Sequence, residues 1–510
     1  MRTVYTTPAI ARTAGPAPQI DADLLIVPVF AEDDLADEAG LHQASGGEVE
    51  RARARGEFTG KLFDQFVTGV TASGWKASRL VLVGAGPRAE FTPDRLRRVA
   101  VVGGLAARQR RVARIGVLHR EGTGVTGVQA AQVIAEGVCL ANYDGGSYKT
   151  EDPVGVWLEH AQLRVDGAAA EIDAALERGR TLGEFSNQAR VLANEPGNTL
   201  TPRVFAERAL AIGSAAGVQV EVLDEKRIAA LKMGLLLGVA QGSQEPPRLV
   251  VLRHEPDNAV PGVVLALVGK GITFDTGGIS IKPAENMDKM KDDMSGGAAV
   301  ICAMAAIARL KAPVRCIGVV PMTENMPGGR AVKPGDVLRS AEGKTVEIIN
   351  TDAEGRLVLG DALWHARQLG ATHLVDLATL TGACVVALGK STTGLFGSPV
   401  QWVEQVQRAS ERAGDRSWPM PVFDDYKDQL KSEIADFTNT GGRAAGAITA
   451  ALFLKEFTGN LPWVHMDIAG TAWAEEAKPY QPKGATGVGV RSLVELALDA
   501  ASWSKLDSGT

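Results

Sequence analysis

Features that mark several protein classes are scarce or missing in this sequence of 510 residues. It contains four cysteines, none in CxxC spacing, and they lie in mostly apolar stretches: Cys139, Cys302, Cys316 and Cys384. We therefore expect reduced core residues of a cytoplasmic protein and no disulfide framework. No apolar run approaches the roughly 18–20 residues that span a bilayer, so we expect no membrane-spanning helix.

A strong charge of one sign is missing as well. The formal net charge of −6 argues against nucleic-acid binding over the whole surface, but it leaves room for a local basic patch. Two stretches in the N-terminal third are rich in arginine, "RLRR" (95–98) and "RQRRVAR" (108–114). A solvated helix face is their ordinary interpretation, and DNA binding stays an alternative.

The N-terminal segment has a weak targeting feature. Its first 19 residues contain Arg and Thr and no acid, as transit peptides for organelles do. They lack the apolar core of a secretory signal, so secretion is not expected. The cytoplasm is the expected location.

The chain is too long for one core of ordinary size, and it alternates strand-like with helix-like segments. In the N-terminal third, β-rich runs at 24–30, 79–86 and 114–119 are interleaved with helical spacing at 93–111 and 128–143. This alternation predicts an α/β sheet covered by helices. Longer apolar strands repeat the pattern from about residue 195 onward.

A long amphipathic run at 168–196, stopped by Pro196, separates these regions. We interpret it as a helix that links two domains. The predicted parts are a smaller N-terminal α/β domain (1–165), a linking helix (166–193) and a larger C-terminal α/β catalytic domain (194–510).

Two glycine-rich segments are similar to nucleotide-binding loops. "GTGVTG" (122–127) matches the GxGxxG pattern after a strand-like run, and "GAGPRA" (84–89) is a near match. A dinucleotide site also needs an acid at the end of the next strand, about 20 residues later. After the first segment that distance falls in the polar loop "YDGGSYKTED". Tight turns are the preferred interpretation, and nucleotide binding is a minor alternative.

Chemically useful side chains gather in the segment 263–300. An apolar strand ends in Lys270, and Asp275 follows in a Gly-rich loop. Lys282 comes after the next β-like run, and Asp293 precedes an alanine-rich helix. In open α/β sheets, groups beyond the carboxyl ends of strands converge on the ligand crevice.

A second such segment is "NTDAEGRL" (350–357). Asp352, Glu354 and Arg356 lie where the β-like run "KTVEII" gives way to helical spacing. Taken singly, these residues and those of the first segment have ordinary structural roles as helix caps, turn residues or solvated strand ends.

Taken together, four carboxylates held close repel one another unless positive charge lies between them. Two divalent cations carry enough charge to balance them, and oxygen ligands suit Mn²⁺, Mg²⁺ or Zn²⁺. Paired ions can share a water, lower its pKa and stabilise a tetrahedral intermediate. None of the seven histidines falls in these motifs, which argues against a zincin-type protease.

These segments resemble the leucyl aminopeptidase (cytosol aminopeptidase) family, most of all its bacterial members. The resemblance covers roughly residues 190–495, and the N-terminal third matches weakly. Besides "VGKGITFDTGGISIKP" and "NTDAEGRL", it is carried by "NEPGNTLTP" (194–202), "ENMPGGRAVKPGD" (324–336), "DLATLTGA" (376–383), "GGRAAGAITAALFLKEF" (441–457) and "PWVHMDIAGTAW" (462–473).

The resemblance implies a small N-terminal α/β domain, a linking helix and a larger α/β catalytic domain whose central mixed sheet is flanked by helices. It implies a homohexamer with active sites facing an inner cavity. The implied activity is release of N-terminal residues, leucine and similar ones, from peptides by attack of a water activated by two metal ions.

It also implies residue roles. The metal ligands would be Lys270, Asp275, Asp293, Asp352 and Glu354, with Asp275 and Glu354 bridging two divalent ions per subunit, Mn²⁺ or Zn²⁺, with Mg²⁺ as an alternative. A lysine ligand must be neutral, so its pKa would be strongly depressed. Lys282 would polarise the scissile carbonyl, and Arg356 would hold a bicarbonate ion that shuttles a proton. The substrate pocket would include Met290, Asn350, Thr379, Leu380 and Gly382.

One ligand position has two candidates, because "KDDMSGG" contains adjacent acids. The family pattern places the ligand immediately before Met, which favours Asp293 over Asp292. A two-metal phosphoesterase is the alternative enzyme class. It would need phosphate-binding basic groups or histidines, which are sparse in these segments.

Overall fold

The computed structural model describes residues 3–33, 40–120, 122–151 and 155–504. The chain forms two compact units, unit 1 with residues 1–187 and 476–483, and unit 2 with residues 188–475 and 484–510. The boundary between Asn187 and Gln188 falls inside α5 (Ala169–Asn194), a helix of 26 residues. The amphipathic run at 168–196 forms this helix, which ends two residues before Pro196.

Unit 1 is built on a six-stranded sheet in the order β1-β6-β5-β2-β4-β3. Neighbouring strands are parallel, apart from β3, which runs antiparallel to β4. The strands are β1 (Ala9–Thr13), β2 (Leu24–Phe30), β3 (Gln65–Gly69), β4 (Arg79–Gly86), β5 (Arg114–Leu118) and β6 (His160–Arg164).

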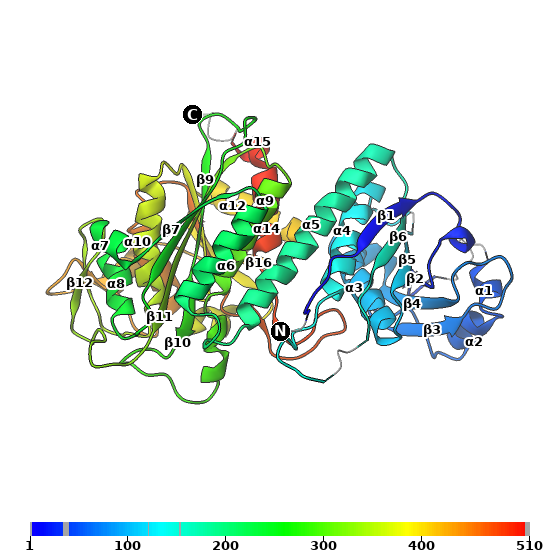
Figure 1. The fold of residues 1–510 in the computed structure, drawn as a ribbon, viewed down its shortest axis with the longest axis horizontal. Coiled ribbons are helices and arrows are strands. Elements are labelled where there is room, and N and C mark those ends of the chain that lie inside the picture. Colours follow the sequence, from blue (N-terminus) through cyan, green and yellow to red (C-terminus); the bar gives the residue numbers. More distant parts are fainter. Residues whose placement is uncertain (1–2, 34–39, 121, 152–154, 505–510) are drawn as a thin grey trace. The chain divides into compact units, whose positions relative to one another are not determined.

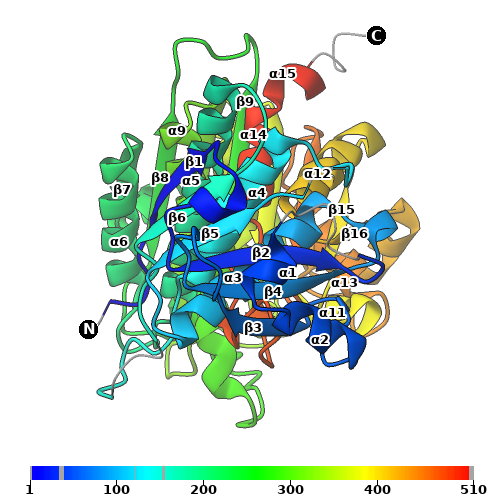
Figure 2. The same ribbon diagram turned by 90° about the vertical axis from the view of Figure 1, so that its right-hand side faces the viewer.

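Helices cover both faces of this sheet (Figures 1 and 2). On β2, Leu24 and Ile26 pack in the core formed with α3 (Pro93–Gln109), α4 (Gly127–Ala141) and α5. Leu25 and Val27 point to the opposite face, which α1 (Leu41–Ala44) and α2 (Glu48–Ala54) cover. Because successive strand residues face opposite sides, burial of both faces explains the uninterrupted apolar run of β2.

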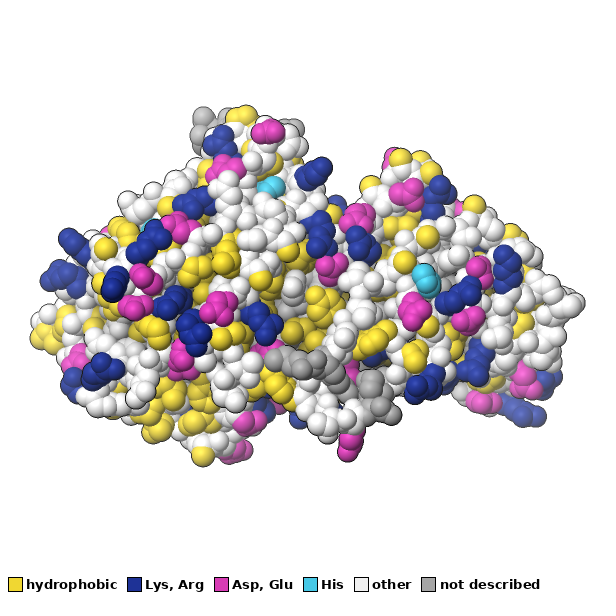
Figure 3. Space-filling model, viewed as in Figure 1, with side chains coloured by type: hydrophobic (Ala, Val, Ile, Leu, Met, Phe, Trp, Pro, Cys, Tyr) yellow, Lys and Arg dark blue, Asp and Glu magenta, His cyan; other side chains and the backbone are white. Residues whose placement is uncertain are grey.

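The arginine-rich stretches of unit 1 serve mainly its own structure. Arg97 is buried, and its Nε lies 2.5 Å from Oε2 of Glu136. Arg108 is buried as well, and its Nη1 donates to the carbonyl oxygens of Ala141 and Tyr143. These two guanidinium groups are therefore not available to a phosphate backbone. On the face seen in Figure 3, basic and acidic side chains are interspersed.

Gly122 and Gly124 of the GxGxxG-like segment lie in a turn between β5 and α4, and its third glycine, Gly127, is the first residue of α4. Gly122 and Gly124 have φ angles of 67° and 77°, a backbone conformation that glycine adopts without strain. Tight-turn geometry therefore accounts for these two glycines.

Unit 2 is built on a nine-stranded mixed sheet in the order β16-β15-β18-β14-β9-β11-β8-β7, with β10 paired to β11. Its central strands β18, β14, β9 and β11 are parallel, and β7, β8 and β15 run antiparallel to a neighbour. The strands are β7 (Gln219–Leu223), β8 (Arg248–His254), β9 (Val264–Gly269), β10 (Gly271–Asp275), β11 (Arg315–Asn325), β14 (His373–Ala378), β15 (Thr393–Ser398), β16 (Ser417–Pro419) and β18 (Trp463–Asp467).

Helices lie on both sides of this sheet too (Figure 1). One face is covered by α8 (Gly234–Ala240), α10 (Gly355–Gln368) and α13 (Gly446–Lys455), whose apolar side chains share a core with the sheet. The other face is covered by α6 (Pro202–Ala215), α9 (Ser295–Arg309), α12 (Val400–Ala413) and α14 (Val490–Leu498). The predicted α/β class, with a central mixed sheet flanked by helices, is confirmed.

Small elements complete unit 2. Strands β12 (Val337–Arg339), β13 (Thr345–Glu347) and β17 (Phe437–Thr438) form a three-stranded sheet, and β19 (Trp473–Ala474) pairs with β20 (Gly484–Ala485). The remaining helices are α7 (Glu225–Ala230), α11 (Gly382–Leu388) and α15 (Ala500–Trp503).

The four cysteines all lie in the described part of the chain, where they are buried and free of disulfide bonds. The prediction of reduced core cysteines is thus confirmed. Among helices formed by the described residues, none combines the length and apolarity needed to cross a bilayer.

Candidate active site

Two charged side chains flank the short strand β10. Lys270 lies between β9 and β10, and Asp275 is the last residue of β10. Asp275 was expected in a loop and a β-like run was expected before Lys282, and both expectations were wrong. Residues 271–275 pair in parallel with β11, whereas residues 276–286 form a loop. Both side chains remain at the carboxyl end of the sheet, where ligand crevices form.

A glycine is required two residues after this strand. Gly277 has a φ of 87°, which favours glycine, and a Cβ there would lie 2.6 Å from the carbonyl oxygen of Ser280. The same Cβ would lie 2.8 Å from Oδ1 of Asp352. The "DTGG" sequence therefore lets the loop after Asp275 turn closely against Asp352.

The next acid, Asp293, lies between a 3-10 helix (Met287–Asp292) and the first residue of α9. Its Oδ1 accepts hydrogen bonds from Lys270 Nζ at 2.8 Å and from Thr379 Oγ1 at 2.6 Å. Its Oδ2 also lies 2.8 Å from Lys270 Nζ, but it is buried and accepts no hydrogen bond. This oxygen therefore already lies beside a cationic group, and carboxylate oxygens are the ligands that hard divalent cations prefer.

Glu354 is the N-cap residue of α10, yet its side chain caps no helix N–H group. Its Oε1 instead lies 2.8 Å from Lys270 Nζ. The following residue, Gly355, makes this approach possible, since a Cβ there would lie 2.6 Å from Cε of Lys270. We expected the strand to end directly before the helix. The structure differs, because β13 already ends at Glu347 and Asp352 lies in the loop between strand and helix.

Three acids from distant segments converge. One carboxylate oxygen from each of Asp275, Asp293 and Glu354 lies within 4.8 Å of the other two, and all three residues are buried. Asp352 lies outside this trio and joins it through Lys282, whose Nζ is 2.8 Å from Oδ2 of Asp275 and bonds Oδ1 of Asp352. Asp292, the competing acid, is not part of the trio.

Burial and the neighbouring charges shift the pKa values of residues in this cluster. Burial raises the pKa of Asp293 well above its usual value, and the neighbouring carboxylates add to the effect. Burial alone would lower the pKa of Lys270. The negative charges of Asp293, Glu354 and Asp275 together have the larger effect, so the pKa of Lys270 is raised. Four carboxylates and two ammonium groups leave excess negative charge, which fits a site for hard divalent cations.

Asn325, the last residue of β11, was not among the predicted site residues. Its Nδ2 donates to Asp275 Oδ1 at 2.9 Å and to the carbonyl oxygen of Thr351 at 3.0 Å. It thus fixes the orientation of Asp275 and ties β11 to the loop before Glu354. Its position at the carboxyl end of a central strand was the signal that could have identified it.

Arg356 follows in the first turn of α10. Its Nη1 donates to the carbonyl oxygen of Asn439 at 2.9 Å, and its buried Nε has no acceptor among the described residues. Burial lowers the pKa of Arg356 to about 10. Arg356 is 6% exposed and forms no ion pair with the described carboxylates, so its guanidinium group can accept a small anion.

The lysines and acids of the cluster and Arg356 line one pocket of about 920 Å³. Every residue that the sequence analysis assigned to the site lines it: Lys270, Asp275, Lys282, Met290, Asp293, Asn350, Asp352, Glu354, Arg356, Thr379, Leu380 and Gly382. The volume is in the range of pockets that take peptide-sized ligands. A concave pocket with buried carboxylates and shifted pKa values is typical of an active site.

Comparison with known proteins agrees with this geometry. Residues 187–494 match the model of the cytosol aminopeptidase family catalytic domain, and residues 26–152 match the model of its N-terminal domain. A probable cytosol aminopeptidase from Solibacter usitatus is 48% identical, with 95% of this chain and 98% of the relative covered. One from Koribacter versatilis is 46% identical, also with 95% and 98% covered.

Solved structures are similar as well. A tomato leucine aminopeptidase variant has a TM-score of 0.88 at 33% identity, with 96% of both chains covered. The bottromycin maturation enzyme BotP in complex with Mn has a TM-score of 0.84 at 34% identity, with 94% of this chain and 100% of that chain covered. The chain therefore belongs to the cytosol aminopeptidase family and is a metal-dependent aminopeptidase.

Proposed function

We propose that this enzyme releases single N-terminal residues, leucine and similar ones, from peptides in the pocket around Asp275, Asp293 and Glu354. The observation that carries the proposal is the meeting of these buried carboxylates within 4.8 Å in a pocket open to substrate. Two divalent ions bound there, Mn²⁺ or Zn²⁺ with Mg²⁺ as an alternative, would lower the pKa of a water molecule and polarise a peptide carbonyl.

We assign five residues to the ions: Lys270, Asp275, Asp293, Asp352 and Glu354. The position of Asp275 between Lys282 and Asn325 supports its place among them. Lys270 must lose its proton to become a ligand, because only the neutral amine has a free electron pair. The main-chain carbonyl of Asp352 is a further candidate donor.

Two cationic residues would act on the substrate side. Lys282 is held by Asp275 and Asp352 at the edge of the cluster, where its ammonium group would donate to the carbonyl oxygen as negative charge develops. Arg356 would hold a bicarbonate ion, which provides an oxygen for proton transfer. The burial of Arg356 and its Nε, which has no acceptor among the described residues, support this assignment.

The side chain of the N-terminal residue would lie against a second group of lining residues. We assign this role to Met290, Asn350, Thr379, Leu380 and Gly382, because all of them line the pocket. Thr379 is bonded to Asp293, so the substrate wall and the carboxylate cluster are positioned together.

We also propose the domain division 1–165, 166–193 and 194–510, a homohexamer and a cytoplasmic location. The family-model boundaries at 26–152 and 187–494 support the division. Exposed apolar side chains of unit 2, such as Trp418 and Phe423, support contacts between chains. Light scattering on the purified protein tests the hexamer, and a mass of one chain would overturn it. The names of the curated relatives support the cytoplasm.

Turnover of leucine p-nitroanilide tests the proposed function. We expect hydrolysis with Mn²⁺ or Zn²⁺, its loss after chelator treatment and its return when metal is added back. p-Nitrophenyl phosphate serves as the comparison substrate, since a two-metal phosphoesterase would turn it over. Activity that is indifferent to metal removal, or faster with the phosphate ester, would overturn the proposal.

A further inference from the structure

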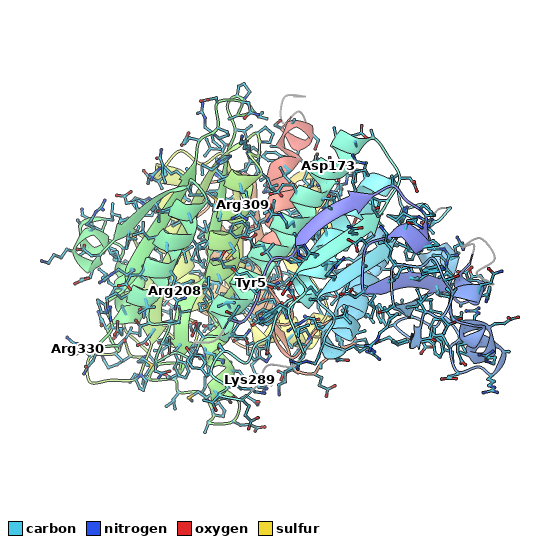
Figure 4. The ribbon with its side chains drawn as sticks, turned by 45° about the vertical axis from the view of Figure 1, so that its right-hand side comes forward. Tyr5, Asp173, Arg208, Lys289, Arg309 and Arg330 are labelled. Carbon is cyan, nitrogen blue, oxygen red and sulfur yellow. The ribbon has the colours of Figure 1, made fainter. Side chains whose placement is uncertain are left out.

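A buried amide, that of Asn325, lies between the segments that carry Asp275 and Glu354. Asn325 is the last residue of β11 and is 2% exposed. Five residues further along the chain, Arg330 is exposed, and Figure 4 labels it on the loop that follows β11. The buried start and the exposed part of this loop can therefore be changed separately.

The main chain of Asn325 holds the end of β10 in place. Its carbonyl oxygen accepts from the main-chain N–H of Thr276 at 3.0 Å and from Thr276 Oγ1 at 2.8 Å. Thr276 directly follows Asp275. The Asn325 side chain therefore starts from a backbone that is already fixed relative to Asp275.

The surroundings of the Asn325 side chain determine which way its amide points. Three oxygens lie near Nδ2: Asp275 Oδ1 at 2.9 Å, the carbonyl oxygen of Thr351 at 3.0 Å and Glu354 Oε2 at 3.5 Å. Only a donor satisfies these acceptors, so the amide nitrogen must face them. Its two hydrogens account for the two shorter distances, one to a carboxylate of β10 and one to the loop before Glu354.

The bond from Asn325 leaves one oxygen of Asp275 for an ion. Asp275 Oδ1 also accepts from the main-chain N–H of Gly277 at 2.9 Å. A carboxylate oxygen has two lone pairs, so these two donors engage both of them. The other oxygen, Oδ2, lies 2.8 Å from Nζ of Lys282 and thus already faces a cationic group. Asp275 therefore presents Oδ2 to the cluster.

The loop before α10 is held to the same end of β10. Thr351 is 1% exposed, and its Oγ1 donates to the carbonyl oxygen of Gly277 at 2.6 Å. The same oxygen accepts from the main-chain N–H of Ser280 at 2.8 Å. These bonds hold the loop after Asp275 against the loop before Glu354, and Asn325 joins both loops to β11.

We propose that Asn325 is a positioning residue for the metal site, whose amide directs Oδ2 of Asp275 toward the ions and holds this carboxylate in place relative to Glu354. The inference rests on the proposed function, because it takes these carboxylates as ligands of divalent ions. Asn325 does not line the pocket, so it acts on an ion only through the carboxylates beside it. Loss of a group that is hydrogen-bonded to a metal ligand typically lowers metal affinity 10–100-fold.

Titration of the metal-stripped, full-length protein with Mn²⁺ tests the proposal. The electron paramagnetic resonance signal of the free ion gives the bound fraction at constant pH. Asn325→Leu keeps the approximate size of the side chain and removes both N–H donors, and we expect the Kd for Mn²⁺ to rise about 10- to 100-fold. Asn325→Ser removes the amide in a smaller, polar side chain and should show the same loss, so the result does not depend on the folding of one variant.

Two controls separate positioning from a general effect on stability. Asn142→Leu removes another fully buried amide, whose Nδ2 donates to the carbonyl oxygens of Thr6 and Leu158 within unit 1. It should lower the melting temperature of the metal-free protein and leave the Kd for Mn²⁺ unchanged. Arg330→Gln changes the exposed part of the loop after β11 and should bind Mn²⁺ like the wild type.

The proposal is overturned if both Asn325 variants bind Mn²⁺ as tightly as the wild type, or if Asn142→Leu weakens binding as much as Asn325→Leu. A wild type that hydrolyses leucine p-nitroanilide only with Mn²⁺, together with unchanged affinity in the Asn325 variants, would overturn this inference alone. A wild type that binds no Mn²⁺ would overturn the proposed function and this inference together.

Discussion

A side chain as small as alanine at position 355 would collide with Lys270, because a Cβ there lies 2.6 Å from Cε and 2.8 Å from Nζ of that lysine. The lysine end is flexible, so it would move while the backbone stays in place. We expect Gly355→Ala to fold normally and to lose activity ~100-fold, since a displacement of about 1 Å can have that effect. Leucine p-nitroanilide turnover and a thermal melt measure the two outcomes.

Gly329→Ala is the matched control, since nothing lies within 4 Å of a Cβ at position 329. It should retain full activity. If Gly355→Ala were as active as this control, the position of Lys270 would be unimportant to the site.

Metal binding should release protons. Without an ion, the carboxylates of Asp293, Glu354 and Asp275 overcome the effect of burial and raise the pKa of Lys270, so its amine is charged at neutral pH. Burial raises the pKa of Asp293 as well, so this acid also holds a proton more readily than usual. Ligands must be deprotonated, so affinity falls as the pH is lowered, by about tenfold per pH unit for each proton released.

Calorimetric titration of Mn²⁺ in two buffers with different ionisation enthalpies counts the protons. Lys270→Met should release about one proton fewer than the wild type, because its side chain carries none. An Mn²⁺ affinity that is constant between about pH 6 and pH 8 would show that Lys270 is not a ligand.

The adjacent acids in "KDDMSGG" should differ in importance. Asp293 is bonded to Lys270 and Thr379 within the carboxylate trio, whereas Asp292 lies outside that trio. Asp293→Ala should reduce kcat/KM by ~100-fold or more, as removal of a group that stabilises the transition state does. Asp292→Ala should cost about tenfold or less. Steady-state kinetics of both variants decide the assignment, and the reverse ranking would transfer the ligand role to Asp292.

In unit 1, the Arg97–Glu136 ion pair should matter for stability. Arg97 Nε lies 2.5 Å from Glu136 Oε2, and both side chains are at most 3% exposed. Glu136→Ala leaves a buried guanidinium with Asp94 as its remaining ion partner and should destabilise the protein by ~3 kcal/mol. Glu48→Ala, which breaks an exposed pair with Arg51, should cost less than about 1 kcal/mol. Urea unfolding measures both, and equal costs would contradict the role of burial.

The sequence was most informative where one physical signal dominates. The runs at 24–30 and 79–86 became strands with those bounds, since continuous apolar residues bounded by polar or glycine residues suit a doubly covered sheet. Strand β10 was missed because "GITFD" is short and lies beside glycines. Its strand character comes from pairing with β11, a long-range contact that local pattern does not show.

In the site, too, some residues could be predicted from the sequence and others could not. The lysines and acids of the cluster were predicted as candidates from their places after apolar runs or before helical spacing, and their roles as metal ligands from the resemblance to the family. Asn325 was missed, since an amide at a strand end is ordinary in sequence. The first residue of α13 could not be predicted either, because Ala445 occupies the N-cap in place of the usual Ser, Thr, Asp or Asn.

Anomalous diffraction from crystals soaked in Mn²⁺ tests most directly whether the carboxylates hold a pair of ions. We expect two peaks per chain, both within bonding distance of carboxylate oxygens of Asp275, Asp293 or Glu354, and loss of at least one peak in Glu354→Gln. A chain with no peak at these carboxylates under saturating Mn²⁺, in crystals of active enzyme, would contradict the two-metal site.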